Sequence, residues 1–264
     1  MASDLFSLEG RTALITGGSR GIGRMIAAGF LRQGARVYIS ARKADVVQET
    51  AAALSAEGGT CVALPANVAT VEGARALAAA YGEHESTLDI LVNNAGAAWL
   101  APFDEFPESG WDKVVDLNLK TPFFLTQALA PALRAAASAE RPAKVINIAS
   151  IDGISVNPQE TYPYAASKAG LIHLTRRMAQ QLIRDHIVCS AIAPGPFVSD
   201  MNIAARDRGD EIAQRVPAGR IGRDDDMAGA AIYLASRAGD YVVGATVTVD
   251  GGIAYAASSG AASG

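Results

Sequence analysis

Short runs of apolar, often β-branched residues alternate along this chain with alanine-rich segments whose apolar positions recur at the helical period. Strands that are apolar on both faces and separated by helices are typical of a parallel sheet covered on both sides. The pattern therefore predicts one domain with a doubly wound α/β fold over residues 1–264. Strands are predicted at 12–16, 36–40, 60–64, 88–92, 144–149, 187–193 and 245–249, and helices at 21–33, 44–56, 70–82, 111–137, 162–185 and 224–236.

Two segments do not follow this alternation. Residues 194–222 combine proline, glycine and mixed charge without a clear period, so we expect a mobile segment over the ligand site that shapes substrate choice. The tail at 256–264 has the composition of a flexible linker.

Composition narrows the classes of partner. Half of the 264 residues are hydrophobic, which is enough for one large core, and the net charge of -4 argues against binding nucleic acid or an anionic membrane. The start of the chain has no basic leader, and no apolar run approaches the roughly 20 residues that span a bilayer. Cys61 and Cys189 lie in apolar runs and are expected to be reduced core residues. We therefore expect a cytoplasmic protein that acts on a small molecule.

A glycine-rich segment, TGGSRGIG at 16–23, directly follows the first predicted strand and opens a helix. Gly17, Gly21 and Gly23 permit a tight turn and a close approach of the backbone to a pyrophosphate, which the helix N-terminus attracts. A plain strand-to-helix connection is the alternative interpretation.

The residues after the second strand indicate which dinucleotide is bound. Ala41 and Arg42 stand where a site that prefers NAD(H) places an acidic residue for the ribose hydroxyls. Arg42 and Arg20, together with the hydroxyls of Ser19 and Ser40, can bind a 2′-phosphate, so we expect NADP(H) to be favoured over NAD(H). Alternatively, Arg42 is a solvated residue before the next helix.

Three polar residues suggest proton chemistry. Ser150 ends the apolar run VINIAS, and Tyr164 and Lys168 follow in YAASK, four residues or about one helical turn apart. The ammonium group is expected to lower the pKa of the phenol, which can then exchange a proton with a carbonyl or carbinol oxygen. Each residue also has an ordinary explanation when taken alone: a strand-end cap, a core aromatic and a solvated lysine.

Seven motifs in order resemble the short-chain dehydrogenase/reductase family over about residues 8–252. They are TGGSRGIG, NNAG (Asn93 to Gly96), Asn118, Ser150, Tyr164 to Lys168, Pro194 with Gly195, and VDGG (Val249 to Gly252). The resemblance implies a Rossmann fold with a seven-stranded sheet and an NAD(P)-dependent oxidoreductase. Within the family, the chain looks most like NADPH-dependent 3-oxoacyl reductases, including the rhamnolipid-biosynthesis type.

The resemblance also implies roles for individual residues. Ser150 would bind the substrate carbonyl, Tyr164 would deliver the proton, Lys168 would hold the nicotinamide ribose, and Asn118 would hold a water that leads to Lys168. The residues expected to bind the cofactor are Gly17, Ser19, Arg20, Gly21, Ile22, Gly23, Ser40, Arg42, Asn67, Val68, Asn94, Ala95, Gly96, Tyr164, Lys168, Pro194, Gly195 and Ser199.

The chain departs from the family pattern at three points. Asn67 replaces an aspartate that meets the adenine, and Ser199 replaces a threonine near the carboxamide. The spacing from Ser150 to Tyr164 is fourteen residues, one longer than the commoner value, so the loop at 151–161 must absorb the difference.

Several questions remain open from sequence. The leading function is carbonyl reduction, possibly of a 3-oxoacyl thioester. The alternatives are a dehydrogenase of a sugar, polyol or hydroxysteroid and, ranked lower, a cofactor-binding sensor or scaffold without turnover. The alanine-rich helices and the family resemblance predict a homo-oligomer, either a tetramer or a dimer.

Other polar groups have simpler explanations. His84, His173 and His186 lack the spacing of metal ligands, and Asp224, Asp225 and Asp226 are expected to cap a helix, so no metal is predicted. Trp99 and Trp111 either line a substrate cleft or pack in the core. The arginines at 206, 208, 215, 220 and 223 form either a basic patch for an acidic carrier or a solvated surface.

Overall fold

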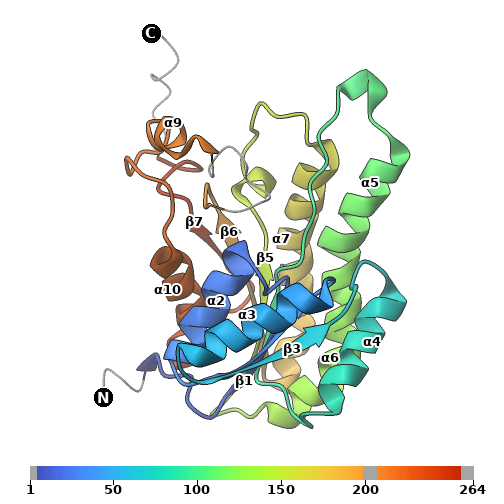
Figure 1. Cartoon of the computed structure of the whole chain (residues 1–264), viewed down its shortest axis with the longest axis vertical. Coiled ribbons are helices and arrows are strands. Elements are labelled where there is room, and N and C mark those ends of the chain that lie inside the picture. The colour runs from blue at the N-terminus through green and yellow to red at the C-terminus, as the bar shows by residue number, and fades with distance from the viewer. Residues whose placement is uncertain (1–4, 199–206, 257–264) are drawn as a thin grey trace.

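The computed structural model describes residues 5–198 and 207–256. The described residues form a seven-stranded parallel sheet in the order β3-β2-β1-β4-β5-β6-β7, which confirms the predicted doubly wound fold (Figure 1). The strands are β1 (Thr12–Thr16), β2 (Arg36–Ala41), β3 (Thr60–Pro65), β4 (Ile90–Asn93), β5 (Ala143–Ile148), β6 (Ile187–Pro194) and β7 (Thr246–Val249).

Helices cover both faces of this sheet. One face is covered by α2 (Gly21–Arg32), α3 (Ala44–Ala56) and α10 (Asp224–Ala235), and the other by α4 (Val71–Gly82), α6 (Thr121–Ala136) and α7 (Tyr162–Leu182). The pleat explains how one strand serves both cores: in β1, Leu14 belongs to the second cluster while its neighbours Ala13 and Ile15 belong to the first. All three are fully buried, as the apolar pattern predicts.

The strand order reverses between β1 and β4, which are hydrogen-bonded neighbours. In sheets of this kind, ligands bind beyond the carboxyl ends of the strands at this reversal. In Figure 1 the segments that follow β4, β5 and β6 rise at the same end of the molecule. That end therefore carries the candidate site.

The predicted helix at 111–137 differs most from the structure. It begins earlier, as α5 (Glu108–Val115), passes through a π-helical turn, η2 (Asp116–Lys120), and continues as α6. The apolar periodicity did not reveal the wider turn, because five residues of π-helix disturb a helical pattern only slightly. Within the described ranges, no helix is long and apolar enough to cross a bilayer.

The segment at 194–222 is partly described. A β-bridge joins Phe197, near the start of the segment, to Gly222 at its end. The short helix α9 (Gly209–Ala213) lies between them. Residues 199–206, which include Ser199 and Arg206, and the tail at 257–264 lie outside the described residues.

Of the three aspartates that open α10, Asp226 makes the expected capping bond, while Asp225 pairs with Arg32 at 3.1 Å. Asp226 accepts a hydrogen bond from the backbone N–H of Arg223 at 2.8 Å, and it pairs with Arg220 at 2.6 Å. These contacts lower the pKa of Asp226. Within the residues that the structure describes, no group of three His, Cys, Asp or Glu side chains can hold a metal ion.

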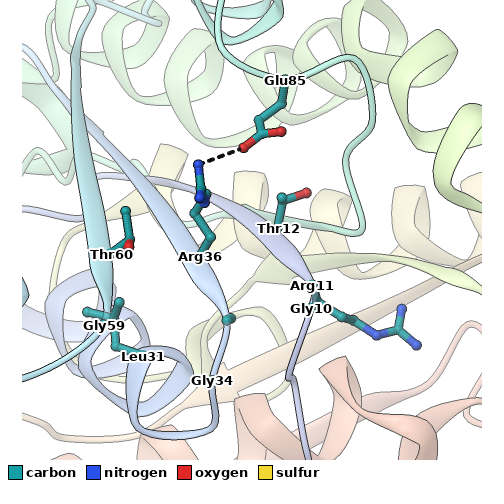
Figure 2. A pocket seen from close by; sticks show the side chains of 10 residues that line it. Gly10, Arg11, Thr12, Leu31, Gly34, Arg36, Gly59, Thr60 and Glu85 are labelled. Atoms are coloured by element: carbon teal, nitrogen blue, oxygen red, sulfur yellow. Dashed lines mark ion pairs between the residues drawn. The ribbon is translucent and has the colours of Figure 1, made fainter.

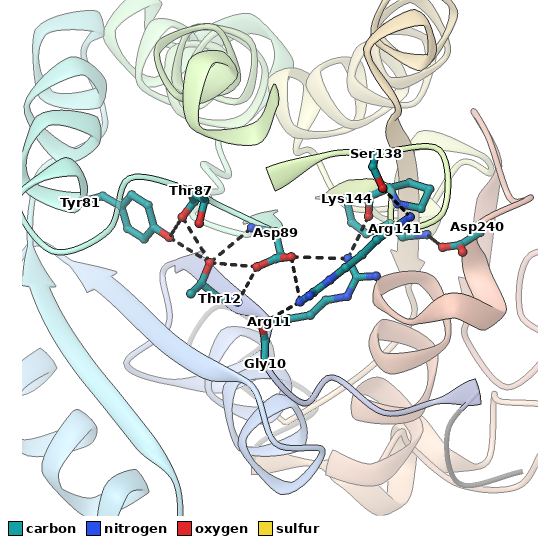
Figure 3. Close-up of polar contacts among 11 residues, drawn as sticks. Gly10, Arg11, Thr12, Tyr81, Thr87, Asp89, Ser138, Arg141, Lys144 and Asp240 are labelled. Carbon is teal, nitrogen blue, oxygen red and sulfur yellow. Dashed lines mark hydrogen bonds and ion pairs between the residues drawn. The ribbon is translucent and has the colours of Figure 1, made fainter. Parts of the chain in front are cut away.

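A charge network lies at the opposite, amino-terminal edge of the sheet (Figure 3). Asp89 accepts a hydrogen bond from Thr12 N at 2.9 Å and pairs with Arg141 at 3.2 Å and with Arg11 at 3.8 Å. Beside it, Lys144 is 1 % exposed and pairs with Asp240 at 2.5 Å. A buried charge is stable only with its partner, so this network fixes the starts of β1, β4 and β5.

We expect Asp89→Ala to lower the free energy of unfolding by about 3 kcal/mol, because the variant leaves the buried guanidinium of Arg11 without its partner. Denaturant unfolding followed by circular dichroism measures the change. The control is Glu57→Ala, which removes an exposed pair with Arg24 and should cost less than about 1 kcal/mol. Equal losses in the two variants would contradict this account of the network.

Candidate active site

The glycine loop joins β1 to α2 and depends on residues without side chains. Gly17 has a φ of +65°, and a Cβ on Gly23 would lie 2.2 Å from the carbonyl oxygen of Gly17. Arg20 is the N-cap of α2 but gives no side-chain cap, and no acidic residue lies in the first turn. The loop therefore leaves a shallow cradle in front of a positive helix end, which suits an anionic group.

The loop after β4 is fastened to this cradle. Asn94 Nδ2 donates to the carbonyl oxygens of Thr16 at 2.9 Å and Gly17 at 3.1 Å. Thr16 Oγ1 in turn accepts the backbone N–H groups of Asn94 and Ala95, each at 3.0 Å. The NNAG segment thus holds the turn in place from the neighbouring strand, and Gly96 follows directly.

The end of β2 carries a buried hydroxyl with no partner. Ser40 is 1 % exposed, and among the described residues nothing hydrogen-bonds its Oγ. Arg42 follows two residues later with an exposed side chain. Ser19 is half-buried in the glycine loop, and its carbonyl oxygen accepts a bond from Thr50 of α3 at 3.1 Å. These residues border one side of the cradle.

The turn after β3 brings two more predicted residues to the same end of the sheet. Asn67 is exposed, and its Oδ1 accepts the backbone N–H of Ala69 at 3.3 Å. Val68 is buried, and its carbonyl oxygen accepts a bond from Thr121 Oγ1 at 2.5 Å. On the other side of the sheet, Gly195 follows β6 and donates its N–H to the carbonyl oxygen of Val249 at 2.9 Å.

Ser150 follows β5 and has its hydroxyl oriented by the chain itself. Its Oγ accepts the backbone N–H of Asp152 at 3.1 Å, as the N-cap of the short 3₁₀-helix η3 (Ile151–Gly153). A hydroxyl both accepts and donates, and Ser150 is also a side-chain hydrogen-bond partner of Tyr164. Ser150 is thus prepared as a hydrogen-bond donor.

Tyr164 and Lys168 lie in the first turns of α7, as the four-residue spacing predicts. Lys168 is 4 % exposed, and its Nζ donates to the carbonyl oxygen of Ile148 at 2.7 Å, close to the carboxyl end of β5. The same nitrogen lies 5.6 Å from the centre of the Tyr164 ring. The ammonium, the phenol and Ser150 therefore come together beyond β5.

The expected lowering of the phenol pKa is not found. The pKa of Tyr164 is raised to about 12, chiefly by burial and also by the charge of Asp152, while the hydrogen bond with Ser150 opposes the rise. Burial also lowers the pKa of Lys168 to about 8. Burial disfavours the charged form of each group, and it is the main cause of both shifts. At neutral pH, Tyr164 is therefore a protonated phenol.

Asn118 occupies the π turn between α5 and α6. Its amide makes a two-way bond with the backbone of Ala97: Oδ1 accepts the N–H at 2.8 Å and Nδ2 donates to the carbonyl at 2.9 Å. Nδ2 also donates to Ser167 Oγ at 3.1 Å. The structure thus joins Asn118 to the loop after β4 and to α7.

Sequence reasoning missed some polar residues around the site. Ser167, inside YAASK, is 1 % exposed and joins Asn118 to the carbonyl oxygen of Tyr164. A second chain of bonds runs from Asn93 Nδ2 to Asn147 Oδ1 at 2.9 Å, and from Asn147 Nδ2 to Thr175 at 2.9 Å. The available signal was an asparagine in each of two otherwise apolar strands.

The two tryptophans have different surroundings. Trp99 packs against Gly110, where a Cβ would lie 2.8 Å from the indole ring, and Lys113 Nζ lies 5.0 Å from the centre of that ring. Trp111 is 43 % exposed on α5. Trp99 is therefore a packing residue of the segment after β4.

A cavity of about 490 Å³ lies away from this site. It is lined by residues at the amino-terminal edge of the sheet, among them Arg11, Thr12, Arg36 and Glu85 (Figure 2). Arg36 and Glu85 pair there at 3.5 Å. The cavity faces away from the carboxyl ends of the strands, so it is no part of the candidate active site.

Comparison with known proteins identifies the family. The model described as enoyl-(acyl carrier protein) reductase matches residues 17–254. The chain is 50 % identical over 250 residues to the rhamnolipids biosynthesis 3-oxoacyl-[acyl-carrier-protein] reductase of Pseudomonas aeruginosa, covering 94 % of this chain and 97 % of that one. It is 35 % identical to the gluconate 5-dehydrogenase of Gluconobacter oxydans, covering 95 % and 97 %.

Among solved structures, the Pseudomonas aeruginosa RhlG/NADP active-site complex superposes with a TM-score of 0.92 at 48 % identity, covering 95 % of this chain and 99 % of that one. The chain belongs to the short-chain dehydrogenase/reductase family. It is accordingly an NAD(P)-dependent oxidoreductase, and the resemblance seen in its motifs is confirmed.

Two features of this short-chain dehydrogenase/reductase fit a bound dinucleotide. The glycine loop is a cradle that a Cβ at Gly17 or Gly23 would fill, and the buried hydroxyl of Ser40 lacks a partner within the described residues. The glycine loop can bind the pyrophosphate, and the hydroxyl of Ser40 lies at the end of β2, where the adenosine ribose of a dinucleotide is bound in this fold.

The structure brings nearly all the predicted site residues to one end of the sheet. Ser40 and Pro194 are among the last residues of their strands, and Asn118 reaches the same end from the π turn through its bonds with Ala97. The others follow the carboxyl ends of strands or lie in the first turns of helices: the glycine loop, Arg42, Asn67, Val68, Asn94 to Gly96, Ser150, Tyr164, Lys168 and Gly195. Ile22 is half-buried in the first turn of α2. Ser199 lies outside the described residues.

Proposed function

We propose that this protein is an NADPH-dependent reductase that converts a 3-oxoacyl thioester to the 3-hydroxyacyl compound. The observation that carries the proposal is the meeting of Ser150, Tyr164 and Lys168 beyond β5, in front of the glycine cradle. The 50 % identity with a 3-oxoacyl reductase supports the choice of substrate.

The proposed roles follow from the protonation of these residues. Ser150 donates its hydroxyl proton to the substrate carbonyl, while its oxygen accepts from Asp152 N–H. Tyr164 keeps its proton at neutral pH and delivers it to the carbonyl oxygen as that oxygen becomes an alcohol. The nicotinamide supplies the hydride when NADPH is bound. Lys168 holds positive charge beside the phenol and can bind the ribose hydroxyls.

Asn118 supports these residues from the π turn. Its side chain is engaged by Ala97 and Ser167, so we propose that it holds the loop after β4 in register with α7. The proposed water that leads protons to Lys168 would be held at this turn. The two-way bond with Ala97 supports a rigid position for that water.

The preference for NADPH rests on the end of β2. Arg42 is a cation at the position where an acidic residue would favour NADH, and Ser40 offers a free hydroxyl beside it. An arginine binds a phosphate through paired, charge-assisted hydrogen bonds. The NADP named in the RhlG complex supports the same cofactor.

A second candidate is a sugar-acid dehydrogenase, which the 35 % identity with a gluconate 5-dehydrogenase supports. The higher identity, 50 %, with a 3-oxoacyl reductase favours the acyl substrate over the sugar acid. A sensor or scaffold without turnover ranks lowest, since the proton-transfer residues are intact and assembled.

We also propose that the protein is a cytoplasmic homo-oligomer. Cys61 and Cys189 are buried and unpaired, which suits a reducing compartment. Trp111 on α5 and Phe123 on α6 are 43 % and 40 % exposed, which supports a further contact over these helices. Whether the assembly is a dimer or a tetramer is tested by light scattering on the purified protein.

The proposal predicts that the purified protein oxidises NADPH with acetoacetyl-CoA and reduces 5-ketogluconate at least tenfold less efficiently. Tyr164→Phe is expected to lower kcat by about 100-fold or more, because it removes the proton donor while keeping the ring. Absorbance at the NADPH band measures the rate, and fluorescence titration checks that the variant still binds NADPH. A Tyr164→Phe variant with a kcat near that of the wild type would contradict the mechanism. A wild-type protein that binds NADPH but reduces no substrate would favour the sensor.

The reduction rate is expected to fall as the pH rises above about 8. Burial lowers the pKa of Lys168 to about 8, so its ammonium form is lost above that value. Oxidation of the matching alcohol should rise over the same range, because Tyr164, whose pKa is raised, must lose its proton. The measurement is kcat/KM in both directions from pH 6 to 10, with circular dichroism as the control for folding. A reduction profile that stays flat to pH 10 would speak against the role of Lys168.

Cofactor preference is expected to depend on Arg42. Arg42→Ala should raise the KM for NADPH by about tenfold and change the KM for NADH less than about twofold, because a charge-assisted pair to the 2′-phosphate contributes about 1.5–3 kcal/mol. The matched control is Arg32→Ala. Arg32 is an exposed cation at the C-terminal end of α2, away from the glycine loop, where it pairs with Asp225. If both variants alter the two KM values alike, Arg42 is a solvated residue.

A further inference from the structure

Glu160 joins two loops that border the candidate site. These are the segment after β4 (residues 97–107) and the segment that leads into the first residue of α7 (residues 154–162), here called the first and second entrance loops. The Glu160 carbonyl oxygen accepts Ala101 N–H at 3.4 Å. Its carboxylate Oε1 accepts Phe103 N–H at 3.2 Å and the hydroxyl of Tyr162 at 3.0 Å. One side chain therefore fastens the first loop to the second.

The joined loops expose an unusual amount of apolar surface. Leu100 is 64 % exposed, Phe103 is 72 % exposed, and Val156 is fully exposed. Tyr162 lies between two phenylalanines, with ring centres 5.5 Å from Phe103 and 5.8 Å from Phe106 in edge-to-face arrangements. Phe103, Phe106 and Tyr162 thus form one aromatic cluster, and Leu100 and Val156 are exposed on the same two loops. Exposed apolar side chains of this kind indicate a binding site for an apolar group.

This surface borders the segment that carries the proton-transfer residues. Tyr162 and Tyr164 lie two residues apart at the start of α7, so their side chains leave the helix on different faces, and the connection to the site runs through the two loops. The first entrance loop begins at Ala97, which Asn118 holds by its two-way bond. The second entrance loop contains most of the segment that absorbs the longer spacing between Ser150 and Tyr164. Both entrance loops therefore follow the ends of β4 and β5, where the site lies, so they border the path of a substrate that extends beyond Tyr164.

Resting on the proposed function, we propose that the entrance loops bind the alkyl tail of a long-chain 3-oxoacyl substrate and that Glu160 is the positioning residue that holds them together. The occupant is an alkyl chain because Leu100, Phe103 and Val156 offer it apolar contacts that a sugar would not use. The carboxylate of Glu160 bonds the backbone of the first entrance loop and the Tyr162 hydroxyl, so it holds the loops together and does not contact the alkyl tail.

The size of the effect follows from burial of methylene groups. Each buried methylene contributes about 0.8 kcal/mol, which is up to about fourfold in affinity. KM is therefore expected to fall along a series of acetoacetyl-, 3-oxooctanoyl- and 3-oxododecanoyl-CoA. When the first entrance loop is released, the longest substrate should lose the burial of about two methylene groups. Its KM should then rise by about tenfold.

The test compares Glu160→Ala, Glu160→Gln and the control Gln159→Ala, which removes an exposed polar side chain from the same loop. Glu160→Ala should raise the KM for 3-oxododecanoyl-CoA by about tenfold, leave its kcat within about twofold, and leave acetoacetyl-CoA nearly unchanged. Glutamine keeps an oxygen that accepts both hydrogen bonds, so Glu160→Gln should restore the KM. Gln159→Ala should resemble the wild type.

Binding of dodecanoyl-CoA, which has no 3-oxo group to reduce, is measured by calorimetry as a readout independent of turnover. Weaker binding of dodecanoyl-CoA by Glu160→Ala supports the role of the entrance loops in binding the alkyl tail, even if the protein does not reduce 3-oxoacyl substrates. The proposal is overturned if the wild type shows no dependence on chain length, if Glu160→Ala affects all three substrates equally, or if the wild type and Glu160→Ala bind dodecanoyl-CoA equally. A change in assembly on Phe103→Ala, seen by light scattering, would assign the surface to a second copy of the chain and also overturn it.

Discussion

Burial of both faces of the sheet is the constraint from which the rest of this structure follows. Helices cover each face, so a polar side chain in the middle of a strand would lie in an apolar core. The polar side chains that can react with or bind a ligand therefore lie at the ends of the strands and on the segments next to them. At one end, the Asp89 and Lys144 networks fix the strands in place, and at the other the chain turns into glycine, asparagine and serine segments that can meet a ligand.

Burial also decides the protonation of the site. Lys168 is held under the segment after β5 by the carbonyl of Ile148, where water cannot stabilise its charge. The same desolvation keeps the proton on Tyr164. The site is thus ready to give a proton, which is what reduction of a carbonyl requires. A more exposed lysine would have retained a higher pKa.

The sequence predicted much of this arrangement because its signals are local. Strands such as 12–16 are apolar on both faces, glycines mark the turn at 16–23, and the spacing of Tyr164 and Lys168 is one helical turn. The π turn at Asn118 and the bonds of Glu160 were not predictable in this way, since they depend on contacts between segments that lie far apart in the chain. The pKa of Tyr164 was wrongly expected to fall because charge is visible in a sequence and burial is not.

The π turn at Asp116–Lys120 also changes how its two flanking helices face the molecule. In a regular α-helix each residue advances the face by about 100°, so the wider turn shifts α6 out of phase with α5. The structure uses this shift: α5 packs on α7, while α6 packs on α4. One continuous segment can thus act as two independent supports. Loss of a single residue here would rotate every side chain of α6 relative to α5 and would move Asn118 away from its bonds with Ala97 and Ser167.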